Sequence, residues 1–286
     1  MSVQITTAFV EQYKANVLHL AQQKGSRLRD AVRTETVTGK SHFFERIGST
    51  SAQKRTSRHS DTPRMDTPHS RRKVSLDDYD WADLIDQEDK VRLLISPQSE
   101  YAMAGAWAMG RAMDDAIISA ATGTAYSGVA GGTSVSLPSG QKVAHASGGL
   151  TLAKLLSAKE ILDAADVDPD EPRFLVCAAG QIADLLNVSQ VTSADYNTVR
   201  ALAAGQIDTY LGFKFIQSER LGTDSTPSRQ CLAFTKSAIG LAVGADVTTK
   251  ISERADKNYA TQVFLSMTIG ATRIEEEKMV EIAANE

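Results

Sequence analysis

The residues that could carry out chemistry in this chain are few and widely spaced. Five histidines occur among the 286 residues: His19, His42, His59, His69 and His145. They fall in polar or irregular stretches, and flexible segments are a poor platform for a preorganised active site. Cys177 and Cys231 are far apart and belong to no C-x-x-C pair, which argues against a zinc site or a disulfide framework. We therefore expect neither catalysis nor a bound cofactor.

Two stretches resemble ligand-binding motifs without completing them. Asp166, Asp168 and Asp170 have the spacing of a calcium loop, but its sixth position is Glu171 instead of glycine and its twelfth is Cys177 instead of glutamate. The segment GVAGGTSVSLPSG is rich in glycine, yet no G-K-[ST] follows it to cradle a phosphate. We expect a solvated turn at the first stretch and irregular structure at the second, with no metal site.

Charge is nearly balanced over the whole chain but is divided sharply along it. The net charge is −4, from 31 basic and 35 acidic residues, which does not indicate a general polyanion binder. Residues 40–73 hold nine Lys or Arg against three acidic residues, whereas residues 76–90 hold seven acidic residues against one lysine. The basic block has almost no large apolar residue after Ile47, so we expect it to be unable to fold alone.

These adjacent blocks leave several interpretations open. They suit an internally paired hairpin, pairing between copies of the chain, or a solvated mobile loop, because exposed ion pairs contribute little individually. Nucleic-acid binding by the basic block would need interleaved aromatic residues or a second basic patch. Phe43 and Phe44 alone give thin support for that interpretation.

The element that must organise the chain is a long helix predicted over residues 97–123. Pro97 suits the first turn, where its missing N–H has no cost, and Gly123 provides a stop. Three apolar stripes run along the helix, so we expect it to be covered from several sides. Arg111 can pair with Asp115 one turn later. The longest uninterrupted apolar run, residues 101–110, is too short to cross a membrane.

A second helix is predicted near the N-terminus. Apolar residues recur at helical spacing from Thr7 to Gly25, namely Phe9, Tyr13, Val17 and Leu20. One narrow apolar stripe at a chain terminus indicates a segment that docks on another surface. Between the charge blocks and the long helix, residues 91–95 predict a short strand.

The second half of the chain predicts an α/β domain and a group of strands. A helix from Thr151, a strand over 173–179, a short helix over 180–187 and a strand through Phe213 describe a small α/β domain. Residues 263–269 then alternate between apolar and other side chains as a sheet strand does. We expect residues 231–286 to return beside the long helix, which makes the α/β domain an insertion.

The order and spacing of these parts resemble the major capsid proteins of tailed double-stranded DNA bacteriophages with the HK97-type fold. The resemblance covers nearly the whole chain and rests on several segments together. These are FVEQYKANVLHLAQQKGSRL, the polar residues 40–80, the helix over 97–123, the series TLAKLLSAKEIL, RFLVCAA and GQIDTYLGFKFIQSERL, and the closing AFTKSAIGLAV with IGATRIEEEKMVEI.

The resemblance implies an α+β fold in which a long spine helix packs on a β-sheet, with an inserted α/β axial domain. The implied divisions are an N-terminal arm over 1–38, an extended loop over 39–90, a peripheral domain over 91–150 with the spine helix 97–123, an axial domain over 151–230, and a return to the peripheral domain over 231–286. In that family the arm and the extended loop lie across neighbouring subunits.

The resemblance also implies a function and partners. The chain would be a structural subunit that self-assembles into pentamers and hexamers of an icosahedral shell, which packages double-stranded DNA without sequence specificity. A portal protein is an expected partner, no membrane is involved, and assembly in the host cytoplasm would precede the virion. Because the sequence starts almost at the arm, we also expect a separate scaffolding protein. The alternatives are an encapsulin-like nanocompartment shell protein and a nucleic-acid-binding protein.

Candidates for contact between subunits come from the arm and the two charge blocks: Phe9, Tyr13, Arg46, Arg71, Arg72, Lys73, Asp77, Asp78 and Asp80. Arg71, Arg72 and Lys73 of one subunit would meet the aspartates of a neighbour. Some family members also crosslink a loop lysine to an asparagine of the peripheral domain. Lys40, Lys54 and Asn258 are present, but no local motif supports such a bond, so we expect noncovalent contacts.

Overall fold

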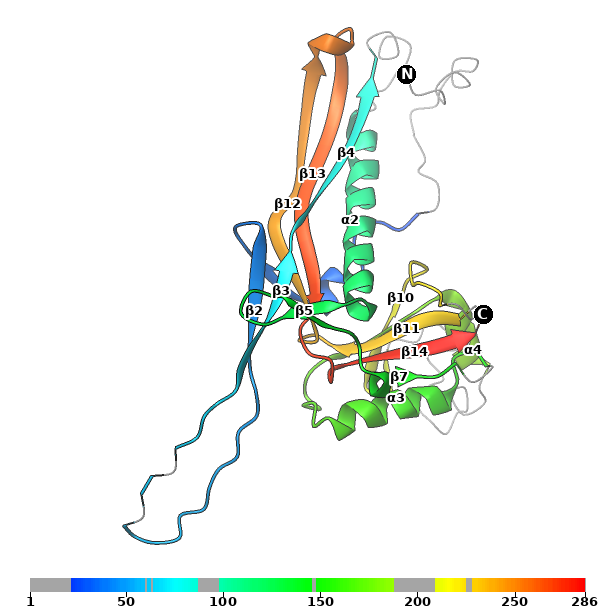
Figure 1. Cartoon of the computed structure of the whole chain (residues 1–286). Helices are drawn as coiled ribbons and strands as arrows, with labels where there is room; N and C mark the ends of the chain where they lie inside the picture. The colour runs from blue at the N-terminus through cyan, green and yellow to red at the C-terminus, as the bar shows by residue number, and fades with distance from the viewer. Residues whose placement is uncertain are drawn as a thin grey trace.

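A computed structural model describes residues 22–59, 61–62, 64–86, 98–145, 148–187, 209–224 and 228–285 (Figure 1). Over these ranges the chain forms three β-sheets arranged around one long helix, with two shorter helices on the axial domain. The predicted strand over 91–95 and most of the predicted N-terminal helix, with Phe9 and Tyr13, lie outside the described residues. Residues 22–25, the end of that predicted helix, are not helical.

The long helix predicted from the sequence is present as α2, Gln98–Thr122. Met109, Met113 and Ile117, which recur every four residues, are all buried. The helix approaches its neighbours closely at two glycines. A Cβ on Gly105 would lie 2.7 Å from the side chains of Leu265 and Trp81, and one on Gly110 would overlap the backbone of residues 25–26. The helix is therefore covered from two sides, as its several apolar stripes indicate.

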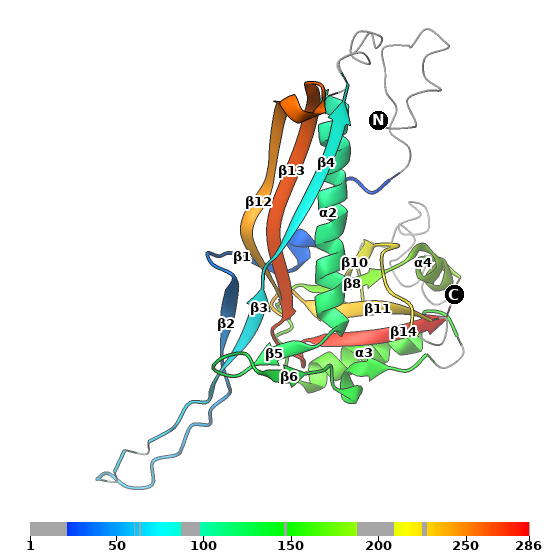
Figure 2. The ribbon, with the colours of Figure 1, turned by 45° about the horizontal axis from the view of Figure 1, so that its top comes forward.

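The sheet under α2 has the strand order β1-β12-β13-β4. Its strands are β1 Arg33–Thr36, β12 Ile239–Arg254, β13 Ala260–Arg273 and β4 Asp77–Ile85. The period of two predicted for residues 263–269 is confirmed, because Val263, Leu265, Met267 and Ile269 are buried while the residues between them are half-buried. The long strands β12 and β13 run beside the helix in both ribbon views (Figures 1 and 2).

The second sheet, which we name the axial sheet, has the order β7-β14-β11-β8-β10-β9 and takes in strands from before and after the predicted axial domain of residues 151–230. Its strands are β7 Lys142–Val143, β14 Met279–Asn285, β11 Ser228–Thr235, β8 Arg173–Cys177, β10 Phe213–Gln217 and β9 Thr209–Tyr210. The helices of this domain are α3, Leu152–Ala164, and α4, Ala179–Leu186. Thr151 caps α3 by accepting a hydrogen bond from the N–H of Lys154 at 3.4 Å.

This sheet corrects the expectation that residues 231–286 return as a whole beside the long helix. Only β12 and β13 do so, whereas β11 and β14 pair with each other inside the axial sheet. The residues of β14 are buried at six successive positions, so both faces of this strand are covered, and a helix of the same domain packs against it. The chain thus crosses between the two sheets twice after residue 228.

The third sheet has the order β2-β3-β5-β6 and forms the base of the extended loop (Figure 2). Its strands are β2 Ser41–Ile47, β3 His69–Ser75, β5 Ala125–Ser127 and β6 Thr133–Val135. A small apolar cluster of Val37, Phe44, Val74, Ala242 and Ile274 attaches this sheet to the rest of the molecule. The sequence segment expected to be irregular after residue 124 therefore contributes two short strands to it.

The acidic block also differs from its prediction. Residues 77–85 form β4, which pairs with β13 along its whole length. The extended loop therefore ends near residue 75, not at residue 90. Alternate residues of β4, such as Trp81 and Ile85, supply apolar side chains to the helix-facing side, while Asp78 and Asp80 are exposed on the other side. This alternation lets a strongly acidic segment serve as a sheet strand.

Candidate assembly interface

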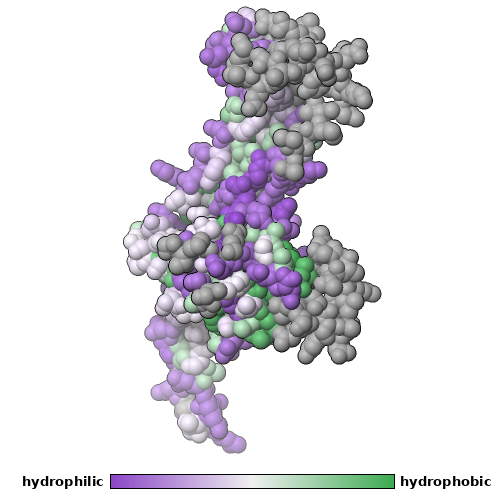
Figure 3. Space-filling model, turned by 90° about the vertical axis from the view of Figure 1, so that its right-hand side faces the viewer, coloured by the Kyte–Doolittle hydropathy of each residue, from purple (hydrophilic) through white to green (hydrophobic). Residues whose placement is uncertain are grey.

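The extended loop projects from the body of the molecule (Figure 1). β2 and β3 pair as an antiparallel ladder, and every described residue from 48 to 68 beyond that ladder is exposed. Four basic residues stand there against two acidic ones: Lys54, Arg55, Arg58 and Arg64 against Asp61 and Asp66. Figure 3 shows this lower part of the molecule mostly in hydrophilic colours. The loop thus offers a basic surface that its own subunit leaves uncovered.

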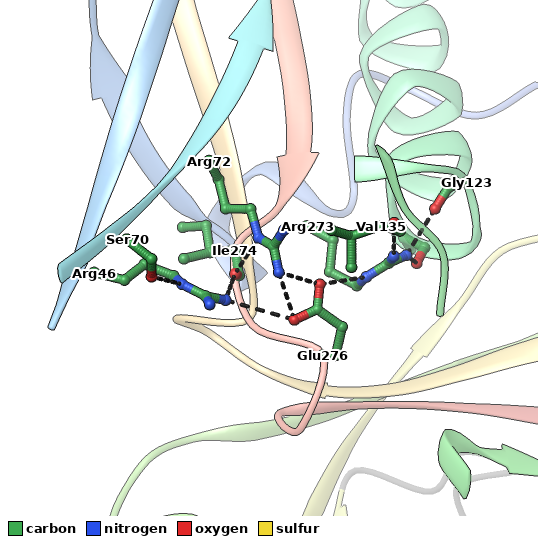
Figure 4. A network of polar contacts seen from close by, with 9 residues as sticks. Arg46, Ser70, Arg72, Gly123, Val135, Arg273, Ile274 and Glu276 are labelled. Atoms are coloured by element: carbon green, nitrogen blue, oxygen red, sulfur yellow. Dashed lines mark hydrogen bonds and ion pairs between the residues drawn. The ribbon is translucent and has the colours of Figure 1, made fainter. Parts of the chain in front are cut away.

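At the base of the loop, three guanidinium groups surround the carboxylate of Glu276 (Figure 4). Arg72 Nη2 donates to both carboxylate oxygens, at 2.5 and 2.7 Å. Arg46 Nη1 lies 3.5 Å from Oε2, and Arg273 Nε lies 3.7 Å from Oε1. The Arg72, Arg273 and Glu276 side chains are 4%, 0% and 8% exposed, so the site is shielded from water.

The same arginines bind backbone carbonyls of several elements. Arg46 and Arg72 both donate to the Ile274 carbonyl, at 2.5 and 3.2 Å. Arg273 donates to Ala121 and Gly123 at the end of α2, at 2.7 and 2.8 Å, and to Val135 of β6 at 3.0 Å (Figure 4). A cation at a helix C-terminus interacts favourably with the helix dipole. Burial nevertheless lowers the pKa of Arg273, which Glu276 partly offsets.

The predicted basic contact residues of β3 differ in burial and in their partners. Arg72 is buried and bound to Glu276 of its own chain, so its guanidinium does not face outward as we expected. Arg71 is more exposed, pairs with Glu45 at 2.7 Å and lies over the Phe43 ring at 5.2 Å. Lys73 is half-buried. Alternation along β3 explains the difference, because Arg72 points to the opposite side of the strand from its two neighbours.

The predicted acidic contact residues lie on β4. Asp77, Asp78 and Asp80 are all exposed, and Asp78 accepts a hydrogen bond from Thr268 at 2.7 Å. The adjacent charge blocks do not form a hairpin with each other, since β3 pairs with β2 and β5, and β4 pairs with β13. Within one subunit the acidic strand and the basic loop therefore belong to different sheets.

The part of the arm that the structure describes is held against α2 by a buried carboxylate. Asp114 is fully buried and accepts hydrogen bonds from Gln23 Nε2 and Ser26 Oγ, both at 2.5 Å. It also accepts from the backbone N–H groups of Arg27 and Leu28, at 3.0 and 3.1 Å. These four donors fix the path of the chain where it meets the helix.

The expected pairing of Arg111 with Asp115 on α2 is wrong. Arg111 donates instead to the Gln22 side chain and the Gln23 carbonyl, at 3.0 and 3.2 Å. Asp115 is bound by Arg220 of the axial domain. Arg111 and Asp115 therefore each bind a distant segment of the chain. A pair between neighbouring turns of a helix is weak, so these contacts replace it.

A buried lysine joins the linker to the axial domain. Lys154 Nζ donates to the carbonyl oxygens of His145, Gly148, Gly149 and Ala283, at 2.6 to 3.0 Å. Burial lowers the pKa of this lysine. The carbonyl oxygens supply the partners that a buried ammonium group requires.

The described residues offer no clear site for a metal or cofactor. No group of three His, Cys, Asp or Glu side chains with metal-binding geometry occurs in the described ranges. Asp168 accepts a hydrogen bond from the N–H of Asp170 at 2.9 Å, as in a turn. Cys177 and Cys231 are buried free thiols, and burial raises the pKa of both. None of the helices in the described part is long and apolar enough to span a membrane.

A cavity of about 690 Å³ lies between the arm and residues 171–172 and 236–237. Among its charged lining residues, Arg29 binds Asp246, and Glu171 accepts from the N–H of Ser237 at 2.8 Å. These two contacts are structural, because each joins segments that are far apart in the chain.

Sequence reasoning missed the two carboxylates that hold these elements together. Asp114 is a charged residue that interrupts the apolar surface of the predicted helix. Arg273 and Glu276 follow an alternating strand, where a buried arginine is unexpected. Neither signal names the distant partners, which lie 86 to 91 residues from Asp114 and, for the loop-base arginines, 204 and 230 residues from Glu276.

The long helix on a sheet, the projecting loop and the axial domain together define the α+β fold of viral shell subunits with the HK97-type architecture. A family model described as "Phage capsid protein" matches residues 5–286. The chain belongs to the phage capsid protein family. It is accordingly a structural capsid protein of the virion and not an enzyme.

Solved capsid structures have the same fold. The capsid of the cyanophage P-SCSP1u has a TM-score of 0.75 and 20% identity, over 99% of this chain and 95% of that chain. A Mycobacterium phage Che8 structure has a TM-score of 0.67 and 18% identity, over 95% and 96%. The capsid of a native GTA particle has a TM-score of 0.69 and 13% identity, over 100% and 99%. A search of curated protein sequences gave no match.

Proposed function

We propose that this chain self-assembles into pentamers and hexamers of an icosahedral shell, and that the shell packages double-stranded DNA. The observation that carries the proposal is the projecting loop, whose described residues from 48 to 68 are all exposed. A loop of this kind has its surface free for a neighbouring subunit. Contacts that are weak individually become strong when they are repeated around a closed symmetric ring.

The further partners belong to the same proposal. A portal protein would occupy one position in the shell, a scaffolding protein would guide assembly in the host cytoplasm, and DNA would be enclosed without sequence specificity. The net charge of −4 agrees with a container from which the genome must leave, since a strongly basic wall would hold it back. The contacts between subunits would be noncovalent.

The test is electron microscopy of the soluble fraction after the chain is expressed alone and with a candidate scaffolding protein. We expect closed shells or five-fold and six-fold rings. Shells that protect DNA from nuclease support the phage capsid, whereas shells filled with protein cargo would indicate a nanocompartment. A subunit that stays monomeric in both preparations contradicts the proposal.

We further propose that charge pairs align neighbouring subunits. Arg71 and Lys73 of one subunit would face Asp77, Asp78 or Asp80 of the next, because both sets lie outside the core of their own chain. Reversing the basic pair with Arg71→Glu and Lys73→Glu should reduce assembly at low salt, where charge interactions are screened least. Adding Asp78→Lys and Asp80→Lys should restore it. Unchanged assembly in the first variant would rule the pairing out.

A further inference from the structure

We propose that Glu276 is a positioning residue for assembly, whose carboxylate fixes the angle between the extended loop and the spine helix α2. This inference rests on the proposed function, because the angle matters only if the loop reaches a neighbouring subunit. Glu276 lies between β13 and β14, where the chain leaves the sheet under α2 and enters the axial sheet. It therefore sits at the meeting point of all three sheets.

The groups around the carboxylate come from two parts of the molecule, the loop base and the end of β13. Arg46 and Arg72 belong to the two strands of the loop base, β2 and β3. Arg273 ends β13 and binds the last turn of α2 together with β6 (Figure 4). A single carboxylate thus links the direction of the loop to the position of the helix end.

The carboxylate is shared unequally between these groups. Arg72 binds both of its oxygens, whereas Arg273 Nε stays at 3.7 Å and has no hydrogen-bond partner among the described residues. A small rotation of Glu276 would exchange a bond to the loop base for a bond to Arg273. The loop base and the helix end therefore depend on the same carboxylate, so a change at the loop base would alter the contact that Glu276 makes with Arg273.

Stability alone does not account for this arrangement. Buried ion pairs contribute little net stability compared with well-packed apolar residues, because the charges must be desolvated. Three guanidinium groups around one carboxylate are also unbalanced in charge. Buried charges of this kind are better explained by orientation, since each hydrogen bond to the carboxylate fixes the position of the strand that carries the donor.

Besides the Glu276 network, the loop base is held by the pairing of β3 with β5, by contact of β3 with β13 and by one small apolar cluster. The apolar cluster that attaches it contains five buried residues, whereas the core cluster under α2 continues into the axial domain. The loop then projects far from this base in both ribbon views (Figures 1 and 2). A small change of angle at the base is therefore a large displacement at the tip, where the neighbour would be met.

The test compares Glu276→Gln, which removes the charge with little change of shape, with the matched control Glu277→Gln. Glu277 is the next residue but is exposed. We expect amide exchange in β2 and β3 of the free Glu276→Gln subunit to be about tenfold faster than in the wild type. Its shells should show shifted or broadened diameters by electron microscopy, while the control should match the wild type in both measurements.

Identical shells and identical exchange in Glu276→Gln would overturn the inference, and the shell function itself would stand. A lower unfolding temperature with normal shells would mean that Glu276 serves stability only, which also overturns it. If Glu276→Gln does not fold, Arg46→Gln provides the second test, because Arg46 is at the edge of the network and its side chain is 23% exposed. Unchanged shells in that variant would likewise overturn the inference. If the wild type forms no shells, the proposed function fails instead.

Discussion

At the scale of single residues, Asp114 shows how one buried carboxylate can define the path of a chain. It satisfies two side chains and two backbone N–H groups of residues 23–28. Its neighbour Asp115 is 44% exposed and makes one ion pair with Arg220. The two adjacent aspartates therefore differ in structural importance, and substitution of Asp114 should lower stability more than substitution of Asp115.

We predict that Asp114→Ala lowers the free energy of unfolding by about 1–3 kcal/mol, because it leaves buried donors without acceptors. Asp115→Ala should cost less than about 1 kcal/mol, as expected for an exposed pair. Urea unfolding of the free subunit measures both values. Equal losses in the two variants would contradict the assignment of Asp114 as the anchor of the arm.

The two cysteines give a second prediction at this scale. Burial raises the pKa of Cys231 to about 12 and raises that of Cys177 as well. Since the thiolate is the reactive form, neither residue should react with a thiol reagent at pH 8 in the folded subunit, and both should react after denaturation. Rapid labelling of the native protein would show that the axial sheet opens.

At the scale of elements, α2 depends on glycines where other segments touch it. Gly110 has no room for a Cβ because the backbone of residues 25–26 lies against it. We predict that Gly110→Ala destabilises the subunit by about 1–3 kcal/mol, although alanine favours a helix by about 1 kcal/mol. Thermal unfolding measures the change.

The control for this prediction is Gly180→Ala in α4. Nothing lies within 4 Å of a Cβ built at Gly180, so alanine should keep or slightly raise stability there. If Gly110→Ala also raised stability, the close packing of the arm on the helix would be absent in solution.

At the scale of the whole molecule, the extended loop is a long exposed stretch of the described chain, and we propose that neighbouring subunits cover it. We predict that trypsin cleaves the free subunit within the extended loop, after Lys54, Arg55, Arg58 or Arg64, because these residues are exposed. Assembled shells should resist the same cleavage, as mass spectrometry of the fragments would show. Equal cleavage in subunit and shell would mean that neighbours do not cover the loop.

The sequence by itself determined the local elements and their order. The long helix, the helix start at Thr151, the strand predicted over 173–179 and found as Arg173–Cys177, and the alternation in β13 depend on signals that act over a few residues. These elements in order were enough to indicate the capsid fold. Local signals of this kind are readable because the interacting residues are near one another in the chain.

Only the tertiary structure decided which distant residues meet. It placed residues 77–85 of the acidic block in strand β4 instead of a loop, turned Arg72 inward to Glu276, and divided the last strands between two sheets. Each outcome depends on which apolar surfaces and charged groups become buried together, and these come from segments that are far apart in the sequence. The physical reason is that burial and ion pairing are properties of the assembled core, whereas helix and strand periods are properties of a short segment.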